Sequence, residues 1–93
     1  MGLDLYVRKY GKIKTNKKGQ YYWTVTELLR LRNTWEYLDL LELENCKTEE
    51  YDGEVLWDEA LHIQNETERN YVLDELKNAK IKRNDYYRVH AWW

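Results

Sequence analysis

The segment from residue 24 to residue 45 constrains the fold of this chain most, because a helix start signal precedes a helical pattern of apolar residues. Thr24 and Glu27 have the spacing of a capping box, in which each side chain accepts a hydrogen bond from the other residue's backbone N–H. We therefore predict a helix over residues 24–45, with the rest of the chain organised around it. Beyond Leu38 the leucines no longer share one face, so this helix is either covered on more than one side or ends there. Its apolar stripe is formed by Leu28, Leu31, Trp35 and Leu38.

The two ends of the chain show the two-residue alternation of half-buried β-strands. Because the two patterns match, we expect the N- and C-terminal strands to pair side by side in one antiparallel sheet. The inward-facing positions would be Leu3, Leu5 and Val7 at the start of the chain and Tyr87, Val89, Ala91 and Trp93 at its end.

Asn65 predicts the start of a second helix, since its side chain can cap the first turn and Glu68 follows at the capping-box spacing. An apolar stripe continues from Val72 to Ala79, and the helix is expected to end near Lys80. The sequence thus predicts an α+β fold for a single domain, residues 1–93. We expect a small antiparallel sheet of three to four strands with two helices packed on one face, and with the N- and C-terminal strands adjacent.

Three connecting segments are less regular. Residues 15–19 contain Asn and Gly, which accept the positive φ of a turn, so residues 20–23 are predicted to return as a short second strand. Residues 46–53 predict a polar connection that ends in an Asp-Gly turn. Residues 54–64 fit a strand and a helix about equally well, and we favour a short strand or an irregular segment.

The formal net charge of −2 is unevenly distributed along the chain. Residues 1–32 carry eight basic and two acidic residues, and residues 79–93 carry four basic residues and one acidic residue. Residues 33–78 carry fourteen acidic residues and three basic ones. A chain that is basic at both ends and acidic in the middle is typical of proteins with charged partners.

The residue types exclude several kinds of active site. Ser is absent, which removes serine hydrolase chemistry, and the four Gly residues are never clustered into a phosphate-binding loop. Cys46, His62 and His90 are far apart in the chain, with neither a metal-ligand motif nor the local signature of a catalytic Cys–His pair. A single Cys allows no internal disulfide, as expected in a reducing cytoplasm. We therefore expect no enzyme, no metal and no cofactor.

The acidic middle of the chain is the first candidate surface. Ten carboxylates lie between residues 36 and 59, with Trp and Tyr residues among them. Aromatic anchors in a charged surrounding are typical of tight protein interfaces, and such carboxylates can occupy sites that otherwise take phosphates. The predicted partner is a protein with a basic surface. The candidate contact residues are Trp35, Glu36, Asp39, Glu42, Glu49, Glu50, Tyr51, Asp52, Glu54, Trp57, Asp58 and Glu59.

A lysine-rich segment near the N-terminus is the alternative candidate. Five lysines lie between residues 9 and 18, close to the aromatic residues of segment 21–23, and we expect them at the exposed end of a hairpin. Lysines there would bind phosphates and the rings would stack on bases, so this segment predicts a small nucleic-acid-binding protein. The residues of this alternative site are Lys9, Lys12, Lys14, Lys17, Lys18 and Tyr21.

Both ends of the chain also resemble a known group of proteins. Residues 1–6 read MGLDLY, which is similar to the MGLDMY start of small proteins that are common in bacteriophage genomes. Many of these proteins end on a pair of Tyr residues and a terminal Trp, which Tyr86, Tyr87 and Trp92 resemble. The middle of the chain departs from the group, which usually has a longer insertion and a helix containing Trp and His. The group has no assigned activity, so the resemblance implies phage origin and the cytoplasm of a bacterial host, and it transfers no functional residue.

These patterns together lead to one expectation about function. We expect a phage-encoded accessory protein that binds and inhibits a host protein without catalysis, in its most concrete form an anti-CRISPR-type inhibitor. Its acidic, aromatic-studded surface would occupy the basic nucleic-acid-binding site of a CRISPR effector or another defence protein. No apolar run approaches the roughly 20 residues that span a bilayer, so a membrane partner is not expected.

Overall fold

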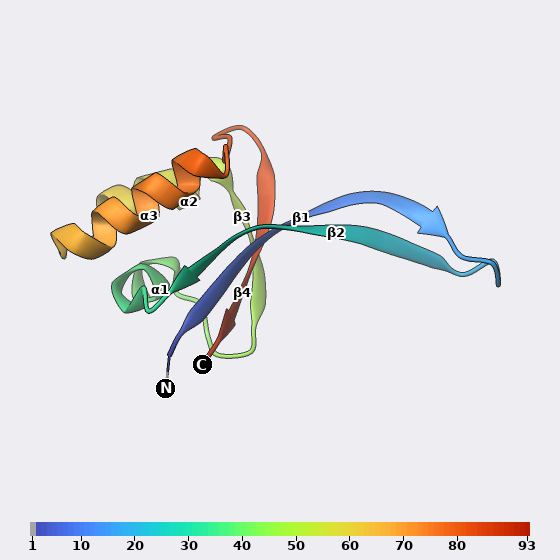
Figure 1. The fold of residues 1–93 in the computed structure, drawn as a ribbon, viewed down its shortest axis with the longest axis horizontal. Helices are drawn as coiled ribbons and strands as arrows, with labels where there is room; N and C mark the ends of the chain where they lie inside the picture. The colour runs from blue at the N-terminus through green and yellow to red at the C-terminus, as the bar shows by residue number, and fades with distance from the viewer. Residues whose placement is uncertain (1) are drawn as a thin grey trace.

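The computed structural model describes residues 2–93, which form an α+β fold (Figure 1). Within them, four antiparallel strands make one sheet in the order β2-β1-β4-β3, and three helices cover one of its faces. Met1, the first residue of the MGLDLY motif, lies outside the described residues. The strands are β1 (Asp4–Thr15), β2 (Tyr21–Arg32), β3 (Thr48–Asp52) and β4 (Tyr86–Trp92), and the helices are α1 (Trp35–Leu41), α2 (Gly53–Leu61) and α3 (Glu66–Asn78).

The first and last strands pair as predicted. β1 and β4 are antiparallel neighbours in the middle of the sheet, from the pair Asp4–Trp92 to the pair Arg8–Arg88. The adjacency of the N- and C-terminal strands and the α+β class are therefore confirmed. Trp93 follows the end of β4 and is only partly buried. The alternating apolar residues that are buried on the helix side of the two strands are Leu5, Val7, Tyr87, Val89 and Ala91.

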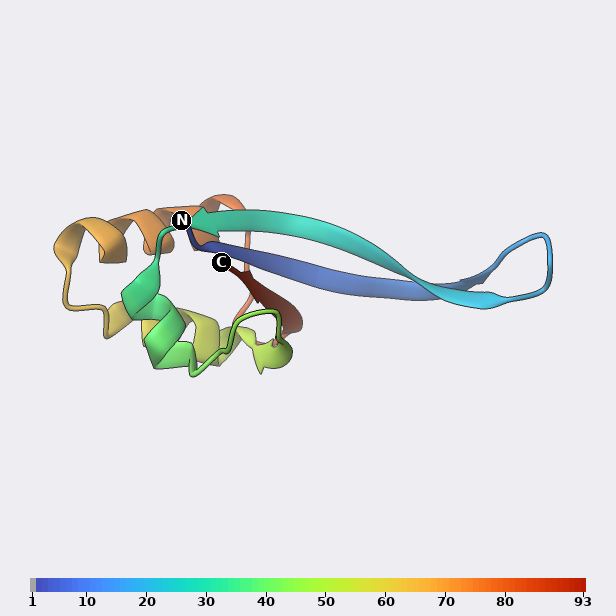
Figure 2. The same cartoon turned by 90° about the horizontal axis from the view of Figure 1, so that it is seen from below.

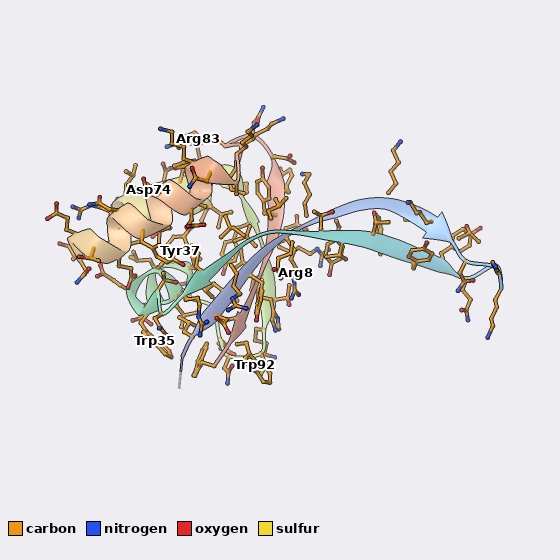
Figure 3. All side chains as sticks on the ribbon, in the orientation of Figure 1. Arg8, Trp35, Tyr37, Asp74, Arg83 and Trp92 are labelled. Carbon is orange, nitrogen blue, oxygen red and sulfur yellow. The ribbon has the colours of Figure 1, made fainter. Side chains whose placement is uncertain are left out.

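Apolar residues of all three helices complete the core on the inner face of the sheet. Tyr37 is only 1 % exposed, and its hydroxyl donates a 2.7 Å hydrogen bond to the backbone oxygen of Leu56, which joins α1 to α2 (Figure 3). Fully burying one large apolar side chain contributes about 1.5–3 kcal/mol to folding. The buried helical residues are Tyr37, Leu38, Leu41, Leu56, Ala60, Val72 and Leu76.

The predicted helix over residues 24–45 is wrong in its first part, because residues 24–32 belong to β2 and the helix begins only at Trp35. Thr24 caps no helix; its hydroxyl instead donates a 3.2 Å hydrogen bond to the backbone oxygen of Lys12 in the opposite strand. Residues 24–26 are three β-branched residues in succession, which suit a strand better than a helix. Pairing with β1 therefore overrides the capping signal.

A β-bulge explains the helical spacing of the leucines in β2. The register pairs Val7 with Leu29 and Arg8 with Glu27, so Leu28 is an extra residue in β2. Leu28 packs against the core, as do the buried residues Leu29 and Leu31. In a regular strand, Leu28 would point to the face opposite to that of Leu29 and Leu31, away from the core. The three-residue step from position 28 to position 31 thus comes from an irregular strand and not from a helical turn.

Residues 46–64 also differ from the prediction. The expected polar connection over residues 46–53 contains β3, which pairs with β4. The preference for a short strand or an irregular segment over residues 54–64 is wrong, because residues 53–61 form helix α2. The side chain of Asp52 caps this helix by accepting a 2.9 Å hydrogen bond from the backbone N–H of Val55. Among the described residues the sheet therefore carries three helices and not two.

The second predicted helix is present as α3. The side chain of Asn65 accepts a 2.8 Å hydrogen bond from the backbone N–H of Glu68, which confirms the predicted cap. The helix ends at Asn78, and Lys80 follows with the left-handed φ of 57°, close to the predicted end.

β1 and β2 extend far beyond the end of β4 and form a two-stranded arm that projects away from the helices (Figures 1 and 2). This arm, residues 9–27, makes the molecule elongated, with extents of 50 × 30 × 19 Å. At its tip Gly19 has a φ of +78°, and the side chain of Asn16 accepts hydrogen bonds from the backbone N–H groups of Lys18 and Gln20. The predicted lysine-rich hairpin is therefore present, although its second strand runs to Arg32 and not only to residue 23.

Candidate binding surfaces on the arm and the outer sheet face

The face of the sheet that the helices leave uncovered carries arginines and aromatic side chains. Side chains alternate along each strand, so the neighbours of the buried residues point to this side. Arg8 lies where the arm leaves the sheet, and Trp92, which is 54 % exposed, lies near the two chain ends (Figure 3). We call this surface the outer sheet face; it is formed by Tyr6, Arg8, Arg30, Arg32, Arg88, His90 and Trp92.

Acidic residues neutralise the outer sheet face only in part. The Nε atoms of Arg30 and Arg32 lie 3.5 and 3.4 Å from a carboxylate oxygen of Asp4. The guanidinium of Arg88 lies 3.7 Å from the carboxylate of Glu50. Ion pairs between exposed side chains contribute at most about 1 kcal/mol each. Glu27 adds a third carboxylate to the face, because it is the cross-strand partner of Arg8, so the four guanidinium groups leave only a small positive charge.

Two of the arginines lie over aromatic rings. The guanidinium of Arg8 is 5.0 Å from the centroid of the Tyr6 ring, and that of Arg88 is 4.4 Å from the centroid of the Tyr10 ring. These distances are those of cation–π contacts, which orient both partners on the surface. Cations and rings therefore form one layer that continues from the sheet onto the arm.

The two faces of the arm have opposite character. Cross-strand partners share a face of the ribbon, and the register places apolar partners on one face and lysines on the other. One face, which we call the lysine face, carries the pairs Lys9–Thr26 and Lys14–Tyr22. The opposite face carries the apolar stripe, whose residues Tyr10, Ile13, Tyr21, Trp23 and Val25 are 38, 52, 80, 56 and 50 % exposed.

A second β-bulge keeps the apolar stripe in phase. Between Tyr10 and Ile13 the register gives β1 one extra residue, so Gly11 and Lys12 oppose Thr24 alone. Without this extra residue, positions three apart in a strand would point to opposite faces. Gly suits position 11 because a Cβ there would lie 2.4 Å from the side-chain oxygen of Thr24.

Lys9 fixes the base of the arm to β4. Its ammonium group forms an ion pair with Asp85, donates a 3.3 Å hydrogen bond to the backbone oxygen of Tyr86 and lies 5.0 Å from the centroid of the Tyr87 ring. The hydrogen bond from Lys9, followed by that from the backbone N–H of Tyr86, lowers the pKa of the Asp85 carboxyl. Lys9 is thus engaged within the protein. The other residues of the predicted nucleic-acid site are exposed on the arm: Lys12, Lys14, Lys17, Lys18 and Tyr21.

Several of the predicted acidic contact residues bind other parts of the protein. Arg83 forms ion pairs with both Glu54 and Asp58, at 3.2 and 2.9 Å (Figure 3). Glu36 accepts hydrogen bonds from two consecutive backbone N–H groups, at 3.1 Å in the case of Asn65. Together with the cap formed by Asp52 and the pairing of Glu50 described above, these contacts use five of the predicted carboxylates to hold elements together.

Two of the predicted aromatic contact residues are partly buried and bind other parts of the protein, and the third is exposed. The hydroxyl of Tyr51 donates a 2.7 Å hydrogen bond to the backbone oxygen of Leu41, and the indole N–H of Trp57 donates a 2.8 Å hydrogen bond to that of Ile81. Both rings are therefore partly buried supports of the fold. Trp35 is different: it is 41 % exposed and contacts the ring of Trp93 edge-on, at a centroid distance of 5.6 Å.

Three of the exposed predicted carboxylates are not engaged with other side chains of the described residues. The carboxylates of Asp39, Glu42 and Glu49 form no ion pair or side-chain hydrogen bond with any of residues 2–93. The carboxylate of Glu59, in contrast, lies 3.9 Å from the ring of His62. Burial, and after it the charges of Glu49 and Glu42, raises the pKa of Tyr51 to about 12. The fold thus brings two of the predicted carboxylates, from β3 and from the end of α1, to the same partly buried phenol.

Sequence alone does not point to the arginines of the outer sheet face or to the apolar stripe. Both depend on β2 being a strand, whereas local signals favour a helix from Thr24 onward. The alternation of Tyr21, Trp23 and Val25 is the signal that reveals the stripe once this segment is assigned to a strand.

Within residues 2–93, no group of three or more His, Cys, Asp or Glu side chains is placed to hold a metal ion. None of the helices in this part of the chain has the length and apolar character needed to cross a membrane. Comparison of the chain with protein-family models, curated proteins and solved structures finds no match.

Proposed function

We propose that this protein is a non-catalytic binding protein that takes single-stranded nucleic acid on its outer sheet face and arm. One observation carries the proposal: the fold brings the two basic ends of the chain together beside exposed aromatic rings. The hairpin of β1 and β2 and the strand β4 are neighbours, and most of the acidic residues lie on the helices and β3.

The chemistry of this surface suits a single strand. Lysines and arginines contact phosphates, and exposed aromatic rings stack on bases that are not already stacked in a duplex. Tyr6, His90 and Trp92 supply rings on the sheet, and Arg30 and Arg88 supply cations between them. Beyond the sheet, the nucleic acid would have to cross the edge of the narrow ribbon to reach Lys14, which lies on the side opposite to Tyr10, whereas Lys17 and Lys18 lie at its tip.

A titration of the full chain with a fluorescent single-stranded oligonucleotide at several salt concentrations tests this proposal. The logarithm of the binding constant should fall with the logarithm of the salt concentration, by about 0.7 for each phosphate contact. The variant Lys12→Gln/Lys14→Gln/Lys17→Gln should bind more weakly and with a smaller slope. The matched control Lys47→Gln/Lys77→Gln/Lys80→Gln removes the same charge from outside the arm and should bind like the wild type. No binding at low salt, or equal losses in both variants, would contradict the proposal.

We also propose a second candidate function, an inhibitor that presents acidic and aromatic residues to the basic site of a host protein, in the manner of an anti-CRISPR protein. The observation that favours it is the exposed Trp35, which packs against Trp93 and has Asp39 one turn further along α1. Glu42 and Glu49 add two carboxylates that make no internal ion pair with residues 2–93. The likeness of the chain ends to small phage proteins supports a bacterial host as the source of such a partner.

Recovery of a protein from a bacterial host lysate by the tagged chain tests this second function. Charge reversal at Asp39, Glu42 and Glu49 should abolish the recovery, because these carboxylates are free to meet a basic partner. Reversal at Glu66, Asp74 and Glu75 on α3 is the matched control and should leave it unchanged. A partner that both variants still recover, or recovery of no protein in any host tried, would count against the acidic surface.

A further inference from the structure

Most of the apolar stripe has no covering element in the described part of the chain. At its inner end Arg88 of β4 lies over the ring of Tyr10, and Lys9 contacts Tyr86 and Tyr87, but further out β1 and β2 pair only with each other (Figure 2). Isolated two-stranded ribbons are marginally stable in water, and a contiguous exposed apolar surface commonly marks an interaction site. The stripe therefore calls for a partner surface.

We propose that two copies of this chain pair through their apolar stripes, arm against arm, around a two-fold axis. A two-fold interface requires a surface that is complementary to itself. The stripe meets this requirement because its own residues are apolar and uncharged: they are Tyr, Ile, Trp and Val, and Thr15 pairs with Tyr21 at its outer end.

The charges of the arm are placed so that they do not oppose this pairing. Lys9 and Lys14 lie on the lysine face, on the opposite side of the ribbon, and would point outward from the pair. At the inner end of the stripe, Arg8 and Glu27 are cross-strand partners of opposite sign. Two packed ribbons lie about 10 Å apart, so each lysine face stays in contact with solvent.

The size of the stripe fits a weak dimer. Aromatic side chains bury on the order of 150–250 Å² each, and Tyr10, Tyr21 and Trp23 are 38, 80 and 56 % exposed, so they offer on the order of 250–450 Å² per copy. Ile13 and Val25 add to this area. A standard protein interface buries about 800 Å² per partner, so a dimer through this stripe would be smaller than standard and in the range of weak interfaces.

The dimer goes beyond the proposed nucleic-acid function and does not depend on it. Each arm would keep its lysine face open, so a dimer would present two such faces and could bind one strand at two places. Other occupants of the stripe are an unrelated apolar protein surface or the bases of a nucleic acid, and the experiment separates these from a second copy.

Sedimentation equilibrium of the purified full chain, free of nucleic acid, over a wide concentration range tests the proposal. The mass should rise from monomer to dimer with concentration. Trp23→Thr should raise the dissociation constant by about tenfold or more, as expected for the loss of a central interface ring. Tyr22→Thr is the matched control: Tyr22 directly precedes Trp23, is 47 % exposed against 56 % for Trp23, and lies on the lysine face, so its removal should leave the dimer unchanged.

Hydrogen exchange gives a second measurement that does not rely on variants. Backbone amides of the arm should exchange more slowly at concentrations where the chain is dimeric than where it is monomeric. A monomer at every concentration would overturn the proposal, and so would a dimer that Trp23→Thr leaves intact. If the free chain stays monomeric while Trp23→Thr abolishes oligonucleotide binding, the stripe is a platform for bases, and the dimer is again overturned.

Discussion

At the scale of single residues, Tyr37 and Tyr51 connect neighbouring elements through their phenol groups. Tyr37 of α1 donates to Leu56 of α2, and Tyr51 of β3 donates to Leu41 at the end of α1, each at 2.7 Å. Burial is the main cause that raises the pKa of both phenols, and nearby charges add to it. Both groups therefore stay protonated in the folded protein at pH values at which an unfolded Tyr ionises.

The raised pKa of Tyr51, about 12, predicts a loss of stability at high pH. An unfolded Tyr has a pKa of about 10, so between these values the unfolded chain has released a proton that the folded chain keeps. The contribution of this group is complete below pH of about 10 and is lost as the pH rises to about 12. Urea unfolding across this range should show the fall. Tyr51→Phe should make it less steep, and Tyr21→Phe, at the exposed end of the arm, should not; equal slopes for all three proteins would contradict the assignment.

Gly53, the first residue of α2, predicts a second effect of a single residue. A Cβ at this position would lie 1.7 Å from the backbone oxygen of Lys82, because the start of α2 packs directly on the loop before β4. Gly53→Ala must displace that loop, so we expect the free energy of unfolding to fall by about 1–3 kcal/mol. Leu61→Ala, at the exposed end of the same helix, should change it by no more than about 0.5 kcal/mol. Chemical denaturation of both variants checks the difference, and an unchanged Gly53→Ala midpoint would show that the loop yields freely.

At the scale of elements, local sequence patterns predict those helices and strands that local contacts determine. The alternation of Leu5 and Val7 correctly predicts a strand, and the cap at Asn65 correctly predicts a helix. In both segments the local sequence pattern and the tertiary packing favour the same element. Residues 24–32 are different, since their partner is β1, and β1 lies outside any local window. Pairing with it overrides the helical spacing of the leucines, with a bulge at Leu28 absorbing the mismatch.

The same distinction holds for the candidate site. The lysines near the tip of the arm can be found from sequence, because they form a run that any exposed turn would display. Arg30 and Arg88 cannot, because only the sheet order makes β2, β1 and β4 neighbours and places both arginines on one face. Nor does sequence show that Glu54 and Asp58 are held by Arg83, which is more than twenty residues further along the chain.

The structure of the arm predicts that it can be removed without loss of the fold. It contributes no residue from positions 10–25 to the buried core. Replacing these residues by an Asn-Gly turn leaves Lys9 and Thr26 as the last cross-strand pair and gives the hairpin a turn that suits its twist. The shortened chain should keep a cooperative thermal transition, with a free energy of unfolding within about 1 kcal/mol of the intact monomer. Loss of cooperative unfolding would mean that the arm supports the core.

At the scale of the whole molecule, the last strand is indispensable. β4 lies between β1 and β3, and β3 has no other partner in the sheet. Deleting residues 87–93 would remove Tyr87, Val89 and Ala91 from the core and leave β1 and β3 with open edges. We expect the truncated chain to lack a cooperative transition in calorimetry or circular dichroism, in contrast to the chain with a shortened arm. A cooperative transition in the truncated chain would show that the remaining strands and helices are sufficient.

The central position of β4 has a consequence for how the chain reaches its native state. The hairpin of β1 and β2 needs only short loop closure and can form before β4 is made, whereas the contact of β1 with β4 joins residues that are 80 to 88 positions apart. During translation the edges of β1 and β3 that later pair with β4 stay unpaired, and they are open to other chains until β4 emerges. The rate-limiting event in folding should therefore be the insertion of β4 between β1 and β3, and the newly made chain is most exposed to misassembly before β4 has been made.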